Sequence, residues 1–296
     1  MSEPCPVCGG NRLDSPLVLP GLRIARCRAC GHREGLHEAQ DHTGGDYHEQ
    51  YDNGAFLDAL RATRVRQARL LIGLLRRHLP ELSAVVDYGA GRGWFLEACR
   101  SAGVAPVAGV DTSQIAVDGL SANGIEAHRL PEGEETSGIL SLLSFRPRAI
   151  SLLDVLEHFP PEQLESRLSG IVSACGEKLE LVIVKVPVPG LLYAGAEALY
   201  RLGNPGPLRQ LYQAGTWPPH FNYFSPTSAE KVLAAAGLSV IERVGDPDFE
   251  PETFGERIGA LGTATKAFAR VGGAALGAAV RVSGRFDSSI FVARPT

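Results

Sequence analysis

The sequence predicts an α/β fold in which a doubly wound, mostly parallel sheet follows a small cysteine-rich ribbon. From about residue 80 onward, apolar β-branched segments alternate with stretches of helical periodicity, the order that places helices on both faces of a sheet. Three apolar segments run into an acidic residue, at Asp87, Asp111 and Asp154. Ligands of such sheets bind at the carboxyl ends of the strands, so we expect the functional site there.

A glycine-rich turn follows the first strand, within Ala84–Arg100 (AVVDYGAGRGWFLEACR). A β-branched run ends in Asp87, and an apolar-periodic helix begins at Trp94. Between them lie Gly89, Gly91 and Gly93. Glycines let a ligand approach the backbone, because a Cβ would occupy the ligand's volume, and the order strand, turn, helix is typical of nucleotide binding. The glycine spacing is not the G-x-G-x-x-G of dinucleotide sites, which argues against NAD.

The turn D-Y-G-A-G-R-G resembles motif I of class I S-adenosylmethionine (SAM)-dependent methyltransferases. Val107–Asp111 (VAGVD) reads as a second strand whose carboxylate can hold both ribose hydroxyls, and Ala149–Phe159 (AISLLDVLEHF) resembles the family segment beside adenine and the methyl group. The resemblance implies a seven-stranded Rossmann-like sheet whose last strand, at Ser289–Arg294, is antiparallel. It implies SAM contacts at Asp87, Gly89, Gly91, Gly93, Asp111, Thr112 and Asp154.

Four of the six cysteines form two C-x-x-C pairs, Cys5 with Cys8 and Cys27 with Cys30, each followed by glycine. This spacing is typical of a structural zinc site with four thiolate ligands and no open position. A redox role would need only one such pair. The other two cysteines, Cys99 and Cys175, lie on apolar helical faces and are expected to fill the core.

We expect three regions: a zinc ribbon over 1–36, an aromatic linker and covering helix over 37–80, and a SAM-binding domain over 81–296. The linker carries Tyr47 and Tyr51. Here the sequence resembles bacterial methyltransferases, including sugar C-methyltransferases, that have a cysteine ribbon and a Y-x-x-x-Y segment over the SAM pocket. The resemblance implies that Tyr47, His48 and Tyr51 face cofactor or substrate, and an equally supported alternative is that the tyrosines anchor the linker.

Two insertions interrupt the alternation of strands and helices, at 189–219 and 245–287. The first predicts two short amphipathic helices over the pocket mouth, and the second a long Ala/Gly helix at about Glu256–Val282. Each insertion has four open interpretations: a lid, a dimer face, a shallow membrane contact, or packing onto the parent domain.

Two histidines are candidates for the base that removes a proton from a neutral acceptor. His158 lies in D-V-L-E-H at a strand end, and His220 lies in a segment that resembles the family element P-H-x-x-x-F-S. Imidazole titrates near neutrality, which suits this role. The alternative is that each histidine braces a loop through hydrogen bonds. In quinone-ring methyltransferases the residue that Glu157 resembles binds a metal, but no second cluster of ligands accompanies Glu157 along the sequence, so we claim no metal there.

The composition of the chain limits the classes of partner and the compartment that we expect. The net charge is −4 and no basic run exceeds two residues, which argues against an extended nucleic-acid partner. Neither a signal peptide nor an 18-residue apolar run is found, so a cytoplasmic protein with reduced cysteines is expected. The predicted function is methyl transfer from SAM to oxygen or carbon of a small molecule: a sugar, lipid-linked or natural-product intermediate. Two alternatives stay open: an RNA methyltransferase that holds RNA with its ribbon, and a non-catalytic SAM-binding scaffold or sensor.

Overall fold

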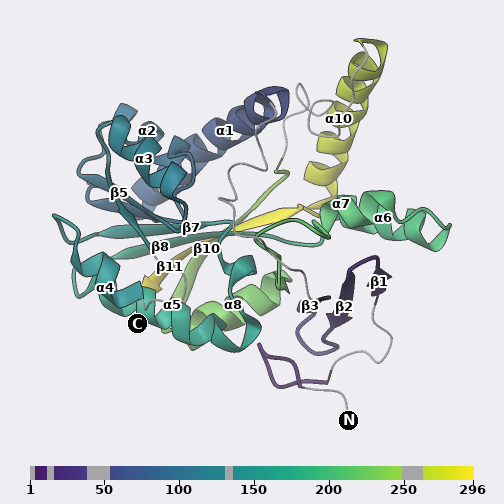
Figure 1. The fold of residues 1–296 in the computed structure, drawn as a ribbon, viewed down its shortest axis with the longest axis horizontal. Helices are drawn as coiled ribbons and strands as arrows, with labels where there is room; N and C mark the ends of the chain where they lie inside the picture. The colour runs from purple at the N-terminus through teal and green to yellow at the C-terminus, as the bar shows by residue number, and fades with distance from the viewer. Residues whose placement is uncertain (1–3, 12–16, 39–53, 131–135, 249–262) are drawn as a thin grey trace.

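The chain forms two sheets, shown in Figure 1. The computed structural model describes residues 4–11, 17–38, 54–130, 136–248 and 263–296. The large sheet has seven strands in the order β10-β11-β8-β7-β4-β5-β6, and the small sheet has four in the order β1-β2-β3-β9.

The large sheet confirms the predicted doubly wound, Rossmann-like architecture. Its strands are β4 (Val85–Tyr88), β5 (Val107–Asp111), β6 (Glu126–Arg129), β7 (Ala149–Leu153), β8 (Leu181–Pro187), β10 (Leu238–Asp246) and β11 (Ser288–Pro295). The first five are mutually parallel, whereas β11 is antiparallel to both of its neighbours, β8 and β10. The carboxyl ends of β4, β5 and β7 therefore meet at one edge, where the predicted motifs lie.

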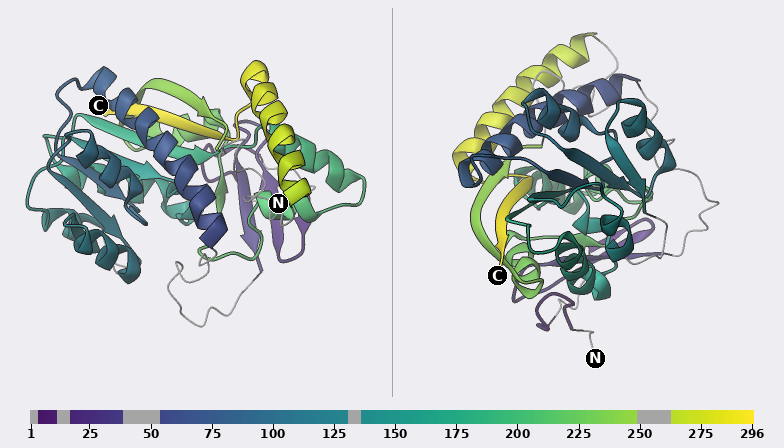
Figure 2. Two further views of the ribbon diagram at one scale, coloured as in Figure 1. Left: turned by 90° about the horizontal axis from the view of Figure 1, so that it is seen from above. Right: turned by 90° about the vertical axis from the view of Figure 1, so that its left-hand side faces the viewer.

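Helices cover both faces of this sheet, as the two views of Figure 2 show. They are α1 (Gly54–His78), α2 (Trp94–Ser101), α3 (Gln114–Ala122), α4 (Thr136–Ser141), α5 (Leu164–Cys175) and α8 (Pro226–Ala235). One apolar core joins α1, α2 and α3 to the sheet and contains Cys99, and the other joins α4, α5 and α8 and contains Cys175. Both cysteines are fully buried, which confirms their predicted role as core fillers.

The small sheet joins the N-terminal ribbon to the rest of the chain. It consists of β1 (Leu17–Leu19), β2 (Leu22–Arg26), β3 (Arg33–His37) and β9 (Asn222–Tyr223), all antiparallel. The pairing of β3 with β9 was not predicted from the sequence, because the paired residues are far apart along the chain.

The first insertion contains the two predicted helices, α6 (Leu191–Arg201) and α7 (Gly206–Leu211). Their apolar side chains pack against the small sheet in a third core. Its fully or nearly fully buried members include Leu22, Ile24, Tyr193, Leu208, Tyr212 and Tyr223. The ribbon and the first insertion therefore bury each other's apolar surface, a contact that periodicity did not predict.

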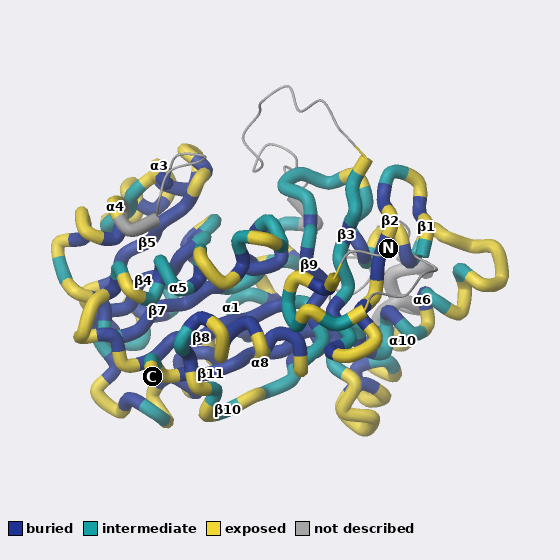
Figure 3. Tube along the Cα trace, turned by 90° about the horizontal axis from the view of Figure 1, so that it is seen from below, coloured by how far each residue is buried: buried dark blue, intermediate teal, exposed yellow. Residues whose placement is uncertain are grey.

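The second insertion contains α10 (Thr263–Ser283), which projects away from the large sheet in Figure 1. The predicted helix Glu256–Val282 agrees from residue 263 onward, and its first residues lie outside the described ranges. Figure 3 shows the strands of the large sheet as mostly buried, whereas much of α10 is exposed. Within the described ranges, no helix is both long and apolar enough to cross a membrane.

Candidate functional site

The glycine turn, Gly89–Gly93, connects β4 to α2. Its three glycines have φ values of 79°, 53° and 74°, a left-handed backbone that other residues adopt only with strain. A Cβ on Gly89 would lie 2.5 Å from Val155 Cγ2, and a Cβ on Gly93 would lie 2.4 Å from Leu120 Cδ2. The neighbouring side chains therefore require glycine at both positions, whether or not a ligand approaches the turn.

Asp111 ends β5 and binds the glycine turn directly. Its Oδ2 accepts the Gly91 N–H at 2.7 Å and its Oδ1 accepts the Ser113 N–H at 2.8 Å. The Ser113 side chain in turn caps α3 by accepting the Ala116 N–H at 3.1 Å. Thr112 is exposed next to this carboxylate.

Asp87 lies one strand away and is almost fully buried. The Ser151 hydroxyl donates a hydrogen bond to its Oδ1 at 2.6 Å. Burial raises the pKa of Asp87 to about 8, the Ser151 bond opposes this shift, and the charge of Asp111 adds to it. A carboxyl with this pKa ionises readily only when a cation lies beside it.

Asp154 follows β7 with φ at 58° and is bound by two cations. Its Oδ1 lies 2.7 Å from Lys185 Nζ, and its Oδ2 lies 2.7 Å from an Arg64 nitrogen. Lys185 is 1% exposed and also pairs with Asp248 at 3.0 Å. This network was not predicted from the sequence. The signal for it was a lysine within the apolar strand Leu181–Pro187, since a buried lysine requires a carboxylate partner.

Glu157, His158 and His220 form one cluster, which we call the Glu157 cluster. Each offers a ligating atom, and these atoms all lie within 4.8 Å of one another. The two imidazole rings are perpendicular, with centroids 4.6 Å apart. Burial lowers the pKa of both histidines, so their rings are neutral, and burial raises the pKa of Glu157. The expectation that no further ligands accompany Glu157 is wrong, because the fold brings His220 to it from 63 residues away.

The ribbon supports this cluster from behind. His37 Nε2 lies 2.8 Å from the His220 carbonyl oxygen, and the Gly35 N–H donates to the Phe221 carbonyl at 2.8 Å. A Cβ on Gly35 would lie only 2.6 Å from the His220 oxygen. The Phe221 N–H donates to the Glu157 carbonyl at 2.8 Å, which ties the two halves of the cluster together. Strand β3 thus fixes the position of His220.

The four ribbon cysteines converge. The Sγ atoms of Cys5 and Cys30 are 3.8 Å apart, those of Cys8 and Cys27 are 3.5 Å apart, and all four lie within 4.8 Å of one another. Four thiolates at about 2.3 Å from one tetrahedral zinc ion lie about 3.8 Å apart, so the arrangement fits that ion. The Ser225 hydroxyl donates to the Cys30 carbonyl, which links this centre to the start of α8.

Arg33 of the ribbon is bound to the first insertion. It pairs with Glu197 at 2.6 Å and donates to the Tyr212 hydroxyl. This arginine, one of those that an RNA-binding ribbon would use, is therefore engaged within the protein. Tyr47, His48 and Tyr51 lie outside the described residues.

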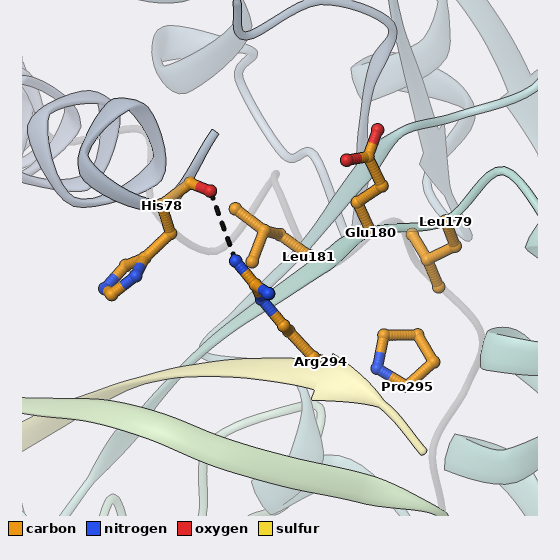
Figure 4. A pocket seen from close by; sticks show the side chains of 6 residues that line it. All are labelled: His78, Leu179, Glu180, Leu181, Arg294 and Pro295. Atoms are coloured by element: carbon orange, nitrogen blue, oxygen red, sulfur yellow. Dashed lines mark hydrogen bonds between the residues drawn. The ribbon is translucent and has the colours of Figure 1, made fainter. Parts of the chain in front are cut away.

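A hollow of about 230 Å³ lies at the opposite edge of the large sheet (Figure 4). It is lined by His78, Leu179, Glu180, Leu181, Arg294 and Pro295. Arg294 crosses it and donates to the His78 carbonyl at 3.4 Å. The hollow adjoins the start of β8, so it is remote from the motifs at the carboxyl ends of the strands.

Comparison with known proteins agrees with the fold. A family model described as a methyltransferase domain matches residues 58–243. A search of curated protein sequences found no match. Among solved structures, the chain is similar to magnesium protoporphyrin IX methyltransferase from Synechocystis PCC 6803 with bound SAH (15% identity, TM-score 0.44, covering 81% of this chain and 86% of that chain).

Two further structures have the same level of similarity. Geranyl diphosphate C-methyltransferase from Streptomyces coelicolor A3(2) has 17% identity and a TM-score of 0.46, with 78% of this chain and 80% of that chain covered. The cyclopropane synthase MmaA2 from Mycobacterium tuberculosis has 14% identity and a TM-score of 0.47, with 75% and 83% covered. Since the family model spans more than half of the chain, the chain belongs to the methyltransferase domain family and is a class I SAM-dependent methyltransferase.

Proposed function

We propose that the protein transfers a methyl group from SAM to an oxygen or carbon atom of a small-molecule acceptor. The observation that carries the proposal is the unit formed by Asp111 and the glycine turn. The Gly91 and Ser113 N–H groups hold the buried carboxylate at the edge where the strands end. A carboxylate fixed at this position suits the two ribose hydroxyls of SAM.

Placing the ribose at Asp111 also sets where the other parts of SAM lie. The glycine turn receives the methionine part, and Asp87 pairs with its ammonium group, which supplies the cation that the raised pKa of this carboxyl calls for. Thr112 adjoins the ribose. Asp154 lies on the methyl side, where Lys185 and Arg64 already fix its carboxylate. Tyr47 and Tyr51 close over the cofactor in this proposal.

The acceptor meets the methyl group beside the Glu157 cluster, which follows β7 at the same edge. Methyl transfer from a sulfonium is an in-line displacement, so the acceptor atom must be held in line with the methyl carbon and sulfur. A neutral acceptor also loses a proton. His158 and His220 are the candidate bases, because burial keeps both imidazoles neutral.

The four ribbon cysteines hold a structural zinc ion in this proposal. Their spacing in the sequence and the convergence of their sulfur atoms support it. A ribbon this small lacks an apolar core of its own, so the metal stabilises it. A stable ribbon then keeps β3 in place, and the contacts of β3 hold His220 in position.

The experiment that tests the proposal is incubation of the zinc-loaded protein with methyl-labelled SAM and a small-molecule extract, followed by mass spectrometry. We expect a labelled small molecule and an equal amount of S-adenosylhomocysteine, and much less of both products with Asp111→Asn at the same SAM concentration. Label found only in RNA would favour an RNA methyltransferase. SAM binding with no transfer to any small molecule would contradict the proposal and favour a SAM-binding scaffold.

A further inference from the structure

We propose that Glu157, His158 and His220 bind a divalent first-row transition-metal ion, a second metal centre distinct from the ribbon. Ligand atoms on one ion with bonds of about 2.1 Å lie at most about 4.2 Å apart. The three ligating atoms of the cluster already lie within 4.8 Å of one another, so a small inward movement brings all three onto one ion.

Two atoms of the cluster are buried without a hydrogen-bond partner among the residues that the structure describes. They are Glu157 Oε2 and His220 Nδ1, in side chains of which 1% and 5% is exposed. A buried polar atom without a partner destabilises the fold, so two of them at one place call for a ligand. A metal ion satisfies both atoms at once.

The third residue is prepared as a ligand. His158 Nδ1 lies 3.0 Å from the Pro219 carbonyl oxygen. A carbonyl only accepts, so Nδ1 carries the proton and donates, and Nε2 keeps its lone pair. Metal-binding histidines are oriented by this kind of bond from the other ring nitrogen to a carbonyl or carboxylate.

The charges around the cluster also favour a cation. Arg64 and Lys185 face two carboxylates, those of Asp154 and Asp248, so these four charges balance one another. The carboxyl group of Glu157 is not part of those ion pairs and is almost fully buried, which disfavours its ionised form. A divalent ion beside it favours the carboxylate, which a neutral ligand does not.

Two imidazoles and one carboxylate suit Zn²⁺, Fe²⁺, Co²⁺ or Ni²⁺ and leave coordination positions open. This consequence rests on the proposed function: an oxygen of the methyl acceptor occupies an open position, and the two histidines are ligands instead of bases. Metal binding itself does not depend on SAM, so it is measured separately.

The test is a titration of the zinc-loaded protein with Co²⁺ alone, followed by visible absorption and by metal analysis after removal of free ions. We expect about one Co²⁺ per chain in addition to the ribbon zinc, with ligand-field bands and no thiolate charge-transfer band. Glu157→Gln and, separately, His220→Gln should weaken Co²⁺ binding at least tenfold. The matched controls are Glu126→Gln and His128→Gln, since Glu126 and His128 form another Glu–His pair 2.9 Å apart on β6.

Absence of saturable Co²⁺ or Zn²⁺ binding beyond the ribbon in the wild-type protein would overturn the inference, whatever the variants do. Binding that the β6 controls weaken as much as the Glu157 and His220 variants would also overturn it. Calorimetry with SAM on the same samples reports on the proposed function and on folding. A protein that binds SAM but no second metal would retain the proposed function and lose this inference.

Discussion

The glycine turn and the Glu157 cluster lie at the same edge of the large sheet, but they are held in different ways. The turn and Asp111 are bound by main-chain N–H groups within about 25 residues of sequence. The Glu157 cluster instead depends on His220, which is fixed by contacts with β3 of the ribbon, more than 180 residues away.

The proposed cofactor site is therefore local in the sequence, whereas the proposed acceptor site is non-local. The glycine turn needs only β4, β5 and their helices, all of which belong to the cores of the large sheet. The cluster needs a ribbon that packs on α6, α7 and β9 in a core of its own. Perturbing the ribbon should therefore affect the acceptor site first and the cofactor site last.

Loss of the ribbon metal is the largest expected perturbation. Replacing Cys27 and Cys30 by serine should remove zinc binding, which contributes on the order of 10 kcal/mol in small zinc modules. Misplacement of His220 by about 1 Å should then lower methyl transfer roughly 100-fold. Hydrogen exchange should show lost protection in β3 and β9 and retained protection in β4 and β7. Cys175→Ala is the control, since it removes a core thiol and should keep the zinc. Equal loss of protection in β4 would contradict the separation of the two sites.

Asp111→Asn tests the cofactor side alone. The charge-assisted bonds to the ribose should be lost, which lowers SAM affinity about 100-fold, or roughly 3 kcal/mol. Fluorescence of Trp94, which begins α2 directly after the glycine turn, can follow the titration. Asp118→Asn is a matched control, because Asp118 is exposed on α3, where it accepts a hydrogen bond from the Gln114 side chain. Equal affinities for SAM in both variants would remove Asp111 from the site.

Gly35→Ala tests how the ribbon positions His220. The added Cβ would approach the His220 carbonyl oxygen to 2.6 Å, so β3 and β9 must separate, at a cost of up to about 3 kcal/mol in the free energy of unfolding. Gly73→Ala is the matched control: its Cβ meets open space on α1, where alanine should stabilise the helix by up to about 1 kcal/mol. Urea unfolding measures both. A destabilisation no larger than that of the control would show that β3 does not press on His220.

The smallest expected effect is a dependence of stability on pH that comes from Asp87. Its pKa is raised to about 8, so the folded protein keeps a proton that the unfolded chain loses near pH 4. Its contribution is complete below pH 4 and is lost as pH rises toward 8, which amounts to about 2 kcal/mol between pH 6 and pH 8. The difference between wild type and Asp87→Asn in urea unfolding should shrink by this amount over that range. A constant difference would show that Asp87 titrates at its ordinary pKa.

The strands and the turn of the proposed cofactor site could be predicted from the sequence because their determinants are local. The β-branched run before Asp87, the glycines and the second strand ending at Asp111 lie in one continuous stretch, and each gives a periodicity or turn signal. The convergence of the four cysteines could also be predicted, because the ligands of structural zinc sites have a characteristic spacing in the sequence.

The acceptor side could not be predicted in the same way. Strand β9 has only two residues, which is too short for a periodic pattern, and its partner β3 is far away in the sequence. Without knowledge of that pairing, nothing in the sequence indicates that His220 lies beside Glu157. The ion pair between Lys185 and Asp154 was also missed, but the sequence contained a signal for it. A lysine inside an apolar strand requires a carboxylate partner, and Asp154 could supply one.

The central claim is that the glycine turn and Asp111 bind SAM, and calorimetric titration of the zinc-loaded protein with SAM tests it most directly. We predict heat of binding for SAM with one site per chain, similar binding of S-adenosylhomocysteine, and no heat for NADH. Binding of NADH together with no heat for either adenosyl compound would contradict the account.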